Sequence, residues 1–168
     1  MCAVLQVALD IMQVGRSVPI AKEAVEGGAD WIEAGTPLIK SGGADAIRIL
    51  RKEFPDRKIV ADTKTMDVGA FEVEIAAKAG ADIITVLGLA DDSTISEAVS
   101  AGRKYGAEIM VDMINVPDKT SRSKEVETLG ASYICLHMGI DAQMKGEAPP
   151  DALLKEIVDA TSIPVAVA

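Results

Sequence analysis

Residues 80–87, Gly-Ala-Asp-Ile-Ile-Thr-Val-Leu, contain the pattern that decides the fold, a Gly-Ala-Asp turn followed at once by a short apolar run. The pattern recurs at 28–30, where Gly-Ala-Asp precedes an apolar run at 31–35. It recurs again at 130–132, where Gly-Ala-Ser precedes the run at 133–137. Each run has the length of a buried strand, and each turn ends a segment whose apolar residues have helical spacing. The pattern therefore predicts strands and helices in alternation.

The same pattern extends along the chain and predicts seven strands separated by six helices. The predicted strands are 4–9, 31–35, 58–61, 83–87, 108–113, 133–137 and 164–168. The predicted helices are 16–26, 44–54, 69–78, 93–105, 118–129 and 151–160. The first six strands start about every 25 to 27 residues, which is the length of one βα unit with short loops. Alternating buried strands and amphipathic helices require a parallel sheet, and this many regular units predict a (β/α)8 TIM-type barrel of the α/β class.

The number of strands bears on whether the barrel is complete. A doubly wound open sheet is the alternative architecture, but no Gly-x-Gly-x-x-Gly sequence follows the first predicted strand. A closed barrel has eight strands over roughly 200 residues or more, and the 168 residues reach only the seventh. We therefore expect one barrel domain over 1–168 that is C-terminally incomplete, with about six βα units and a seventh strand. A fragment, an open barrel and a barrel completed by another chain all fit this expectation.

The composition disfavours several classes of partner and site. The formal charge of −9 argues against nucleic acid and anionic membranes as partners, because both repel an acidic protein. The longest apolar runs are strand-sized and no basic leader begins the sequence, so we expect a cytoplasmic protein. Cys2 and Cys135 form no Cys-x-x-Cys pair, which indicates neither a disulfide framework nor a zinc site. Cys135 lies in an apolar run and is predicted to be a buried structural thiol.

Ionisable residues stand at the C-terminal ends of five predicted strands. They are Asp10, Glu33, Asp62 with Lys64, Asp112 and His137. In a barrel these ends converge on one face, where enzymes of this architecture carry their catalytic groups. Each residue alone could be a loop charge or a helix cap, but their coincidence on one face predicts an active site.

The densest part of this group is Asp62-Thr63-Lys64-Thr65-Met66-Asp67, at the end of the third predicted strand. Side chains two apart in a strand share a face, so Asp62 and Lys64 should point the same way, with Asp67 in the turn that follows. Two carboxylates would keep the lysine protonated and leave oxygens for a metal or a proton. The structural alternative is a solvated ion pair at a strand end.

Two further features indicate metal binding and proton transfer. Glu33 and Asp62 come from adjacent strands and could share one divalent ion. Because this is an oxygen-only set, it suits Mg²⁺ better than zinc. His137, the single histidine of the chain, closes the sixth predicted strand beside the carboxylates, and we predict that it transfers a proton.

Six stretches together resemble the 3-hexulose-6-phosphate synthases, a family within the orotidine 5′-monophosphate decarboxylase suprafamily. They are LQVALD at 5–10, IEAGTPLIK at 32–40, ADTKTMD at 61–67, GADIITVLG at 80–88, VDMI at 111–114 and YICLHMGIDAQ at 133–143. The suprafamily signature is Asp-x-Lys-x-x-Asp after the third strand, here Asp62, Lys64 and Asp67. The resemblance runs in register over essentially the whole chain.

This resemblance implies a reversible aldol condensation of formaldehyde with D-ribulose 5-phosphate, an aldehyde-lyase reaction of the ribulose monophosphate pathway. The product would be D-arabino-hex-3-ulose 6-phosphate, formed through a 1,2-enediolate. Glu33 and Asp62 would ligate Mg²⁺ against the ketose oxygens. Lys64 would stabilise the negative charge of the enediolate together with the metal, and His137 would be the proton-transfer group.

The resemblance also implies the substrate pocket and the assembly. Asp10 and Asp112 would shape the pocket. In this suprafamily the residue at Asp67 reaches into the neighbouring subunit's site, so a homodimer is implied. Barrels of this kind bind the substrate phosphate with the loops after strands seven and eight, so the phosphate-binding residues are expected beyond Ala168.

Two departures separate this chain from other members of the suprafamily. Orotidylate decarboxylases continue the signature with Ile-Pro-Asn-Thr, where this chain has Val68-Gly69-Ala70. The 3-keto-L-gulonate-6-phosphate decarboxylases have an arginine three residues after the strand-six histidine and a glutamate at the end of strand five. This chain has Ile140 and Asp112 at those places. Both differences favour the synthase; the keto-gulonate decarboxylase and a non-catalytic barrel fragment are the alternatives.

Overall fold

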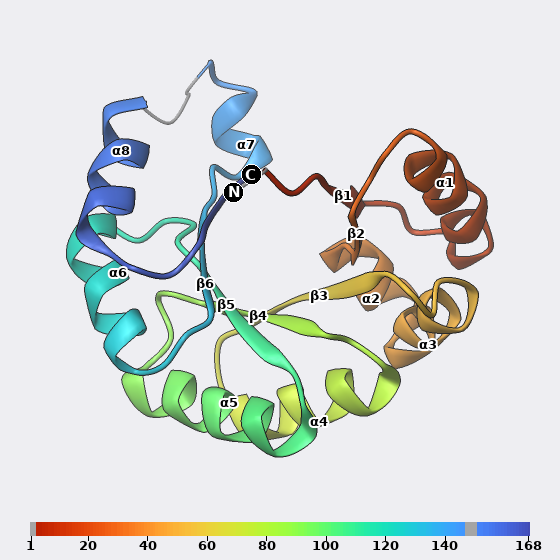
Figure 1. The fold of residues 1–168 in the computed structure, drawn as a ribbon, viewed down its shortest axis with the longest axis horizontal. Helices are drawn as coiled ribbons and strands as arrows, with labels where there is room; N and C mark the ends of the chain where they lie inside the picture. The colour runs from red at the N-terminus through yellow and green to blue at the C-terminus, as the bar shows by residue number, and fades with distance from the viewer. Residues whose placement is uncertain (1–2, 147–150) are drawn as a thin grey trace.

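The centre of the molecule is a curled sheet of seven parallel strands, described for residues 3–146 and 151–168 (Figure 1). In this computed structural model the strands are β1 (Gln6–Leu9), β2 (Trp31–Ala34), β3 (Lys58–Thr65), β4 (Ile83–Leu87), β5 (Glu108–Asp112), β6 (Tyr133–Leu136) and β7 (Val165–Val167). They follow one another in chain order, with β1 and β7 at the two edges. No eighth strand joins these edges within the described ranges. The predicted TIM-type barrel without its last βα units is confirmed.

Helices lie along the outer side of the sheet and connect its strands (Figure 1). They are α1 (Val14–Glu26), α2 (Thr36–Gly42), α3 (Ala44–Glu53), α4 (Gly69–Ala79), α5 (Asp92–Tyr105), α6 (Lys119–Thr128), α7 (Ile140–Gln143) and α8 (Asp151–Ala160). The sequence pattern did not predict α2 and α7, because both are too short for a helical repeat of apolar residues. None of the helices in the described part of the chain has the length and apolar character needed to cross a membrane.

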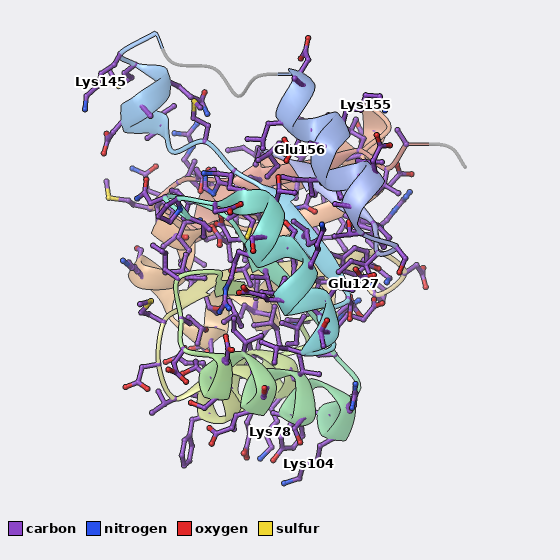
Figure 2. All side chains as sticks on the ribbon, turned by 90° about the vertical axis from the view of Figure 1, so that its left-hand side faces the viewer. Lys78, Lys104, Glu127, Lys145, Lys155 and Glu156 are labelled. Atoms are coloured by element: carbon purple, nitrogen blue, oxygen red, sulfur yellow. The ribbon has the colours of Figure 1, made fainter. Side chains whose placement is uncertain are left out.

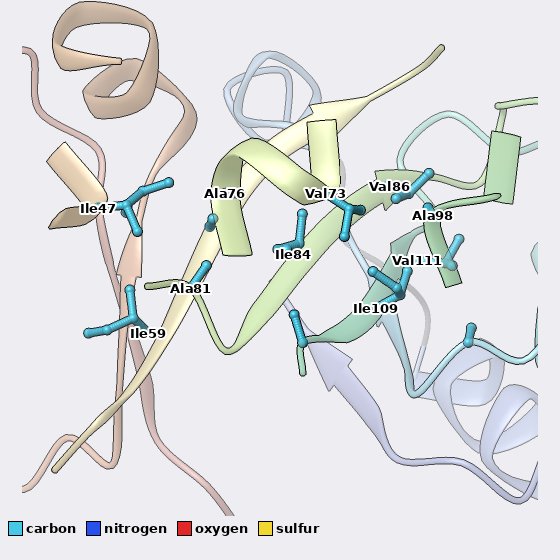
Figure 3. Packing of buried hydrophobic residues seen from close by; sticks show 14 of the residues in the cluster. Ile47, Ile59, Val73, Ala76, Ala81, Ile84, Val86, Ala98, Ile109 and Val111 are labelled. Carbon is cyan, nitrogen blue, oxygen red and sulfur yellow. The ribbon is translucent and has the colours of Figure 1, made fainter. Parts of the chain in front are cut away.

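The main core lies between the sheet and these helices (Figure 3). Ile59, Ile84 and Ile109, from three neighbouring strands, are fully or almost fully buried there. They pack in one cluster with α4 and α5, where Ala76 and Ala98 allow the helices to approach the sheet closely. The outer faces of the helices carry charged side chains instead (Figure 2). This division is the amphipathic pattern expected of helices that cover a buried parallel sheet.

A second apolar cluster fills the inside of the curled sheet. It contains the strand residues that alternate with those of the main core, namely Val60, Ile83, Met110 and Cys135. Cys135 is buried, and burial raises the pKa of its thiol to about 12, which confirms the predicted structural thiol. Cys2 lies outside the described residues.

Aromatic and charged side chains close the N-terminal end of this interior. Trp31 of β2 and Tyr133 of β6 meet edge to face, with ring centroids 5.6 Å apart. The Lys58 ammonium lies 5.3 Å from the Trp31 ring centroid and pairs with the Glu108 carboxylate. Each of the four side chains is on the first residue of its strand. Aromatic packing and an ion pair therefore occupy this end of the interior, opposite to the C-terminal ends of the strands.

Arg51 of α3 ties three chain segments together outside the sheet. Its guanidinium donates hydrogen bonds to the carbonyl oxygens of Gly80 and Arg57, both at 2.9 Å, and to the Asp82 carboxylate. Asp82 in turn accepts the Ile59 N–H at 2.6 Å. Gly80 has φ +107°, a conformation that favours glycine, and its α-carbon lies against the Arg51 side chain. This contact fixes the recurring Gly-Ala-Asp turn to the start of β3.

Candidate active site

The predicted ionisable residues gather at the C-terminal ends of the strands, as the barrel architecture requires. Glu33 lies on β2, Asp62 and Lys64 lie on β3, Asp112 is the last residue of β5 and His137 follows β6 directly. β3 runs to Thr65, four residues beyond its predicted end at 61, because Asp62 and Lys64 belong to the sheet and not to a loop.

Asp62 is buried and is held by hydrogen bonds from three side chains. Its Oδ2 accepts from the Lys64 ammonium at 2.6 Å and from the Thr36 hydroxyl at 2.7 Å. Its Oδ1 accepts from the Thr85 hydroxyl at 2.8 Å. A carboxylate oxygen has room for two partners. Oδ1 therefore keeps an acceptor position for a further donor or a cation.

Lys64 bridges the two buried carboxylates of the site. Its Nζ lies 2.6 Å from Asp62 Oδ2 and 3.3 Å from Asp112 Oδ2. Burial alone would lower the pKa of Lys64, but the hydrogen bonds and charges of Asp62 and Asp112 outweigh it and raise the pKa above its ordinary value. Lys64 is therefore a cation at neutral pH, held between Asp62 and Asp112.

Asp112 fixes the orientation of His137. Its Oδ2 lies 2.8 Å from His137 Nδ1, and its Oδ1 accepts the Ile114 N–H at 2.8 Å. Burial would raise the pKa of Asp112, but His137, this N–H and Lys64 together hold it below its usual range. Because Asp112 is then a carboxylate, the hydrogen-bond network assigns the ring proton of neutral His137 to Nδ1. His137 Nε2 is left as the basic nitrogen.

Glu33 is the second carboxylate predicted to bind a metal. Burial and the charge of Asp62 raise its pKa to about 7, against the opposing effect of a hydrogen bond from the Gln6 side-chain amide. A carboxylate whose ionisation is opposed by a neighbouring carboxylate suits a divalent cation, which would remove the repulsion. Among the described residues no group of three His, Cys, Asp or Glu side chains is arranged to hold a metal. A two-carboxylate set is nevertheless typical of Mg²⁺, which keeps waters and substrate oxygens as its other ligands.

Asp10 and Asp67 stand apart from the ion-pair network. Asp10 is exposed after β1, and its carboxylate lies against Gly35, where a Cβ would come within 2.2 Å of Asp10 Oδ1. Asp67 is also exposed, and its Oδ1 accepts the N–H of Val68 at 2.8 Å. In the described part of the chain it makes no hydrogen bond or ion pair with Asp62 or Lys64. The two carboxylates beside Lys64 are therefore Asp62 and Asp112, and not Asp62 and Asp67 as the sequence predicted.

Three neutral polar residues of the site were not predicted from the sequence. Gln6 donates to Glu33, and Thr36 and Thr85 donate to Asp62. The signal for Gln6 and Thr85 was present, since each is a polar residue within an otherwise apolar run that was predicted to be a strand. Thr36 gave no such signal, because the short helix α2 that carries it was not predicted.

The sequence model of the orotidine 5′-phosphate decarboxylase / HUMPS family matches residues 3–162. The chain belongs to this family. The family member from Bacillus subtilis (strain 168) named 3-hexulose-6-phosphate synthase is 46% identical over 143 residues, covering 85% of this chain and 68% of that protein. The predicted family and the expectation of an enzyme are thereby confirmed.

Solved structures of the family have the same fold. The 3-hexulose-6-phosphate synthase from Salmonella typhimurium superposes with a TM-score of 0.92 at 35% identity, covering 99% of this chain and 78% of that one. The 3-keto-L-gulonate-6-phosphate decarboxylase from Vibrio cholerae superposes with a TM-score of 0.87 at 29% identity, covering 98% and 77%. The identities thus place the chain nearer to these synthases than to that decarboxylase.

Proposed function

We propose that this protein is a 3-hexulose-6-phosphate synthase, which joins formaldehyde to D-ribulose 5-phosphate to form D-arabino-hex-3-ulose 6-phosphate. The observation that carries the proposal is the continuous set of contacts from Asp62 through Lys64 and Asp112 to His137 at the mouth of the barrel. These contacts put a partly buried cation and an oriented histidine on the same carboxylate, and the similarity to named synthases suggests the substrate. The binding of the substrate phosphate and the cytoplasmic location of the protein both stay predictions.

The geometry supports a proton-transfer mechanism. His137 Nε2 takes a proton from C1 of the ketose, and the electrons of that C–H bond form a 1,2-enediolate. Lys64 Nζ and His137 Nδ1 both contact Asp112 Oδ2, at 3.3 and 2.8 Å, and the Lys64 ammonium would stabilise the negative charge of the enediolate that forms beside the histidine. C1 of the enediolate then attacks the carbonyl carbon of formaldehyde, and the alkoxide that results takes the proton back from His137.

We propose that Glu33 and Asp62 hold Mg²⁺. The free acceptor position of Asp62 Oδ1 and the raised pKa of Glu33 are the features that support a cation between them. When bound, Mg²⁺ supplies positive charge that stabilises the ketose oxygens in their anionic form. Lys64 contacts the other oxygen of Asp62, Oδ2, at 2.6 Å and so holds the carboxylate in place.

We also propose a homodimer in which Asp67 contributes to the neighbouring site. Exposed apolar side chains surround Asp67: Met66 and Val68 flank it, and Phe71 and Ile75 follow on α4 at exposed fractions of 70% and 53%. Val68, Phe71 and Ile75 are three and four residues apart and share one face of the chain. A second copy that covers this face would also bury the region around Asp67.

The experiment that tests the proposed function measures formaldehyde consumption in the presence of ribulose 5-phosphate, with Mg²⁺ and with a chelator. We expect metal-dependent consumption by the wild-type chain and at least a 1,000-fold loss in Lys64→Ala, because that variant removes the charge that stabilises the enediolate. Lys155→Ala, which changes an exposed lysine of α8, is the matched control and should keep wild-type activity. A folded wild-type chain that consumes no formaldehyde would refute the synthase and favour a barrel without catalysis.

The 3-keto-L-gulonate-6-phosphate decarboxylase reaction is a second candidate, supported by the similarity of fold to the Vibrio cholerae enzyme. Ile140, where those decarboxylases have arginine, lies 67% exposed at the start of α7 and offers no proton to a decarboxylation intermediate. We therefore expect no CO₂ release from the keto-gulonate phosphate. Release at a rate that exceeds formaldehyde consumption would reverse the order of the two candidates.

A further inference from the structure

The ladder between β3 and β4 is interrupted at the site. Ala61 pairs with Ile84, and the next pair is Thr65 with Val86. Three residues of β3, at 62–64, therefore face the single residue Thr85 on β4. Such a bulge leaves main-chain groups without their ladder partners and re-aims the side chains that it contains. Both Asp62 and Lys64 lie in this bulge, and Lys64 has φ +48°, a conformation uncommon for a residue with a side chain.

Thr85 supplies the partners that the interrupted ladder lacks. Its hydroxyl donates to Asp62 Oδ1 at 2.8 Å and accepts the main-chain N–H of Lys64 at 3.0 Å. Its carbonyl oxygen accepts the Thr63 hydroxyl at 2.7 Å. Thr85 is only 5% exposed, so water does not readily replace these bonds. A hydroxyl has one proton, which here goes to Asp62, and its lone pair serves Lys64.

We propose that Thr85 is a positioning residue of the active site. Its hydroxyl sets the side chain of Asp62 and the backbone of Lys64 relative to each other, and so holds the lysine ammonium where the reacting oxygens form. The inference rests on the proposed function for the reaction itself. Thr85 has no ionisable group, and it would affect the reaction through Asp62 and Lys64.

The proposal predicts that turnover depends on the hydroxyl of Thr85 and not on its volume. Thr85→Val keeps the shape but removes both the donor to Asp62 and the acceptor for the Lys64 N–H. We expect kcat to fall about 100-fold while KM for ribulose 5-phosphate changes little, because small displacements of catalytic groups cost rates of this order. Thr85→Ser keeps the hydroxyl and should retain kcat within about threefold, and Thr85→Cys, a weaker donor, should lie between them.

Thr65→Val is the matched control. Thr65 is a buried threonine of the neighbouring strand β3, at 4% exposed, and among the described residues its hydroxyl has one hydrogen-bond partner, the Thr63 hydroxyl at 3.0 Å. This variant should keep kcat within about threefold. If the loss of any buried threonine hydroxyl lowered activity, kcat would fall equally in Thr85→Val and Thr65→Val. That result would overturn the proposal.

Two measurements separate this inference from the proposed function. Exchange of the C1 hydrogen of ribulose 5-phosphate with D₂O, followed by NMR without formaldehyde, should be present in the wild-type chain and reduced in Thr85→Val in proportion to kcat. Hydrogen exchange of the Lys64 amide needs no substrate, and we expect protection to be lost in Thr85→Val but kept in Thr85→Ser. A wild-type chain without C1 exchange would refute the proposed function, whereas the amide result alone would still show whether Thr85 holds Lys64.

The outcome that overturns the inference is a folded Thr85→Val chain with kcat within threefold of wild type. If Thr85→Val does not fold, the serine and cysteine variants decide. We then expect kcat of Thr85→Cys to be about tenfold below that of Thr85→Ser. Equal values in the two would show that the hydrogen bonds of Thr85 do not govern turnover.

Discussion

At the scale of single residues, neutral side chains hold the charged ones in place. Gln6, Thr36 and Thr85 each donate to a carboxylate that the reaction is proposed to use. Hydrogen bonds to a buried carboxylate are worth more than bonds between neutral groups, and their loss leaves a buried charge without a partner. The charged residues therefore indicate the chemistry, and their neutral neighbours determine its geometry.

Glu33 gives a prediction about the pH dependence of stability in protein freed of divalent metal. Its pKa of about 7 in the folded state lies above its ordinary value of 4.5. Between these two values the folded state binds more protons than the unfolded state, so the free energy of unfolding falls as the pH rises. Glu33→Gln should remove this fall in the free energy of unfolding, because the glutamine side chain does not ionise. At pH 4 we expect the variant to unfold at nearly the wild-type temperature. At pH 8 we expect it to unfold at a higher temperature than wild type, with a free energy of unfolding that is larger by up to about 3 kcal/mol.

Thermal unfolding of both chains with a chelator, from pH 4 to pH 8, checks this prediction. Adding Mg²⁺ at pH 8 should stabilise the wild-type chain more than Glu33→Gln, since the variant lacks the carboxylate charge. A difference between the two chains that does not change with pH would show that burial and Asp62 do not raise the pKa of Glu33.

At the scale of elements, a single arginine joins α3 to two turns. Arg51→Met should lower the free energy of unfolding by about 2 kcal/mol, because the partly buried carbonyl oxygens of Gly80 and Arg57 and the Asp82 carboxylate lose their donor. Arg48→Met on the same helix is the control. Arg48 pairs with Asp45 at the surface with 56% of its side chain exposed, so its loss should cost less than about 0.5 kcal/mol. Urea unfolding compares them, and equal midpoints for both variants would contradict the assigned role of Arg51.

The regular strands and longer helices were predictable from the sequence, but the bulge of β3 at the site was not. The strands β4 and β6 and the helix α8 follow from apolar runs, turn residues and helical spacing, and their observed bounds agree with prediction to within a residue. The bulge at 62–64 could not be predicted in this way. It depends on the pairing of β3 with a residue of β4, and no local pattern in β3 records that pairing.

The same distinction applies to the site. The positions of Asp62, Lys64, Asp112 and His137 at one end of the sheet follow from strand order alone, because the C-terminal ends of parallel strands share a face. The contacts between these side chains do not follow from strand order. The sequence placed Asp67 with Lys64, but the turn after β3 leaves Asp67 exposed and directs its carboxylate to the N–H of Val68.

At the scale of the whole molecule, the face around Asp67 is the proposed interface between two copies. We expect the wild-type chain to have twice the 17.6 kDa mass of one chain in solution. Phe71→Asp combined with Ile75→Asp should give a monomer, because two charges would have to be buried on association. Size-exclusion chromatography with light scattering measures the mass, and formaldehyde consumption should fall with the loss of the dimer.

Val158→Asp is the control for this interface. Val158 is 51% exposed on α8, so the substitution also adds a charge at an exposed apolar position, but on a different helix. It should leave the dimer intact. A wild-type monomer would refute the homodimer, and a double variant that remains dimeric would move the interface to another face.

The edge-to-face contact of Trp31 with Tyr133 has a consequence for how folding of this protein can be observed. Trp31 is the single tryptophan of the chain. It lies on β2 and meets an aromatic ring of β6, so the two come together only when the intervening strands have curled the sheet. The fluorescence of Trp31 therefore reports on the curvature of the sheet from β2 to β6 and not on one local segment, and the molecule carries its own optical probe of sheet curling.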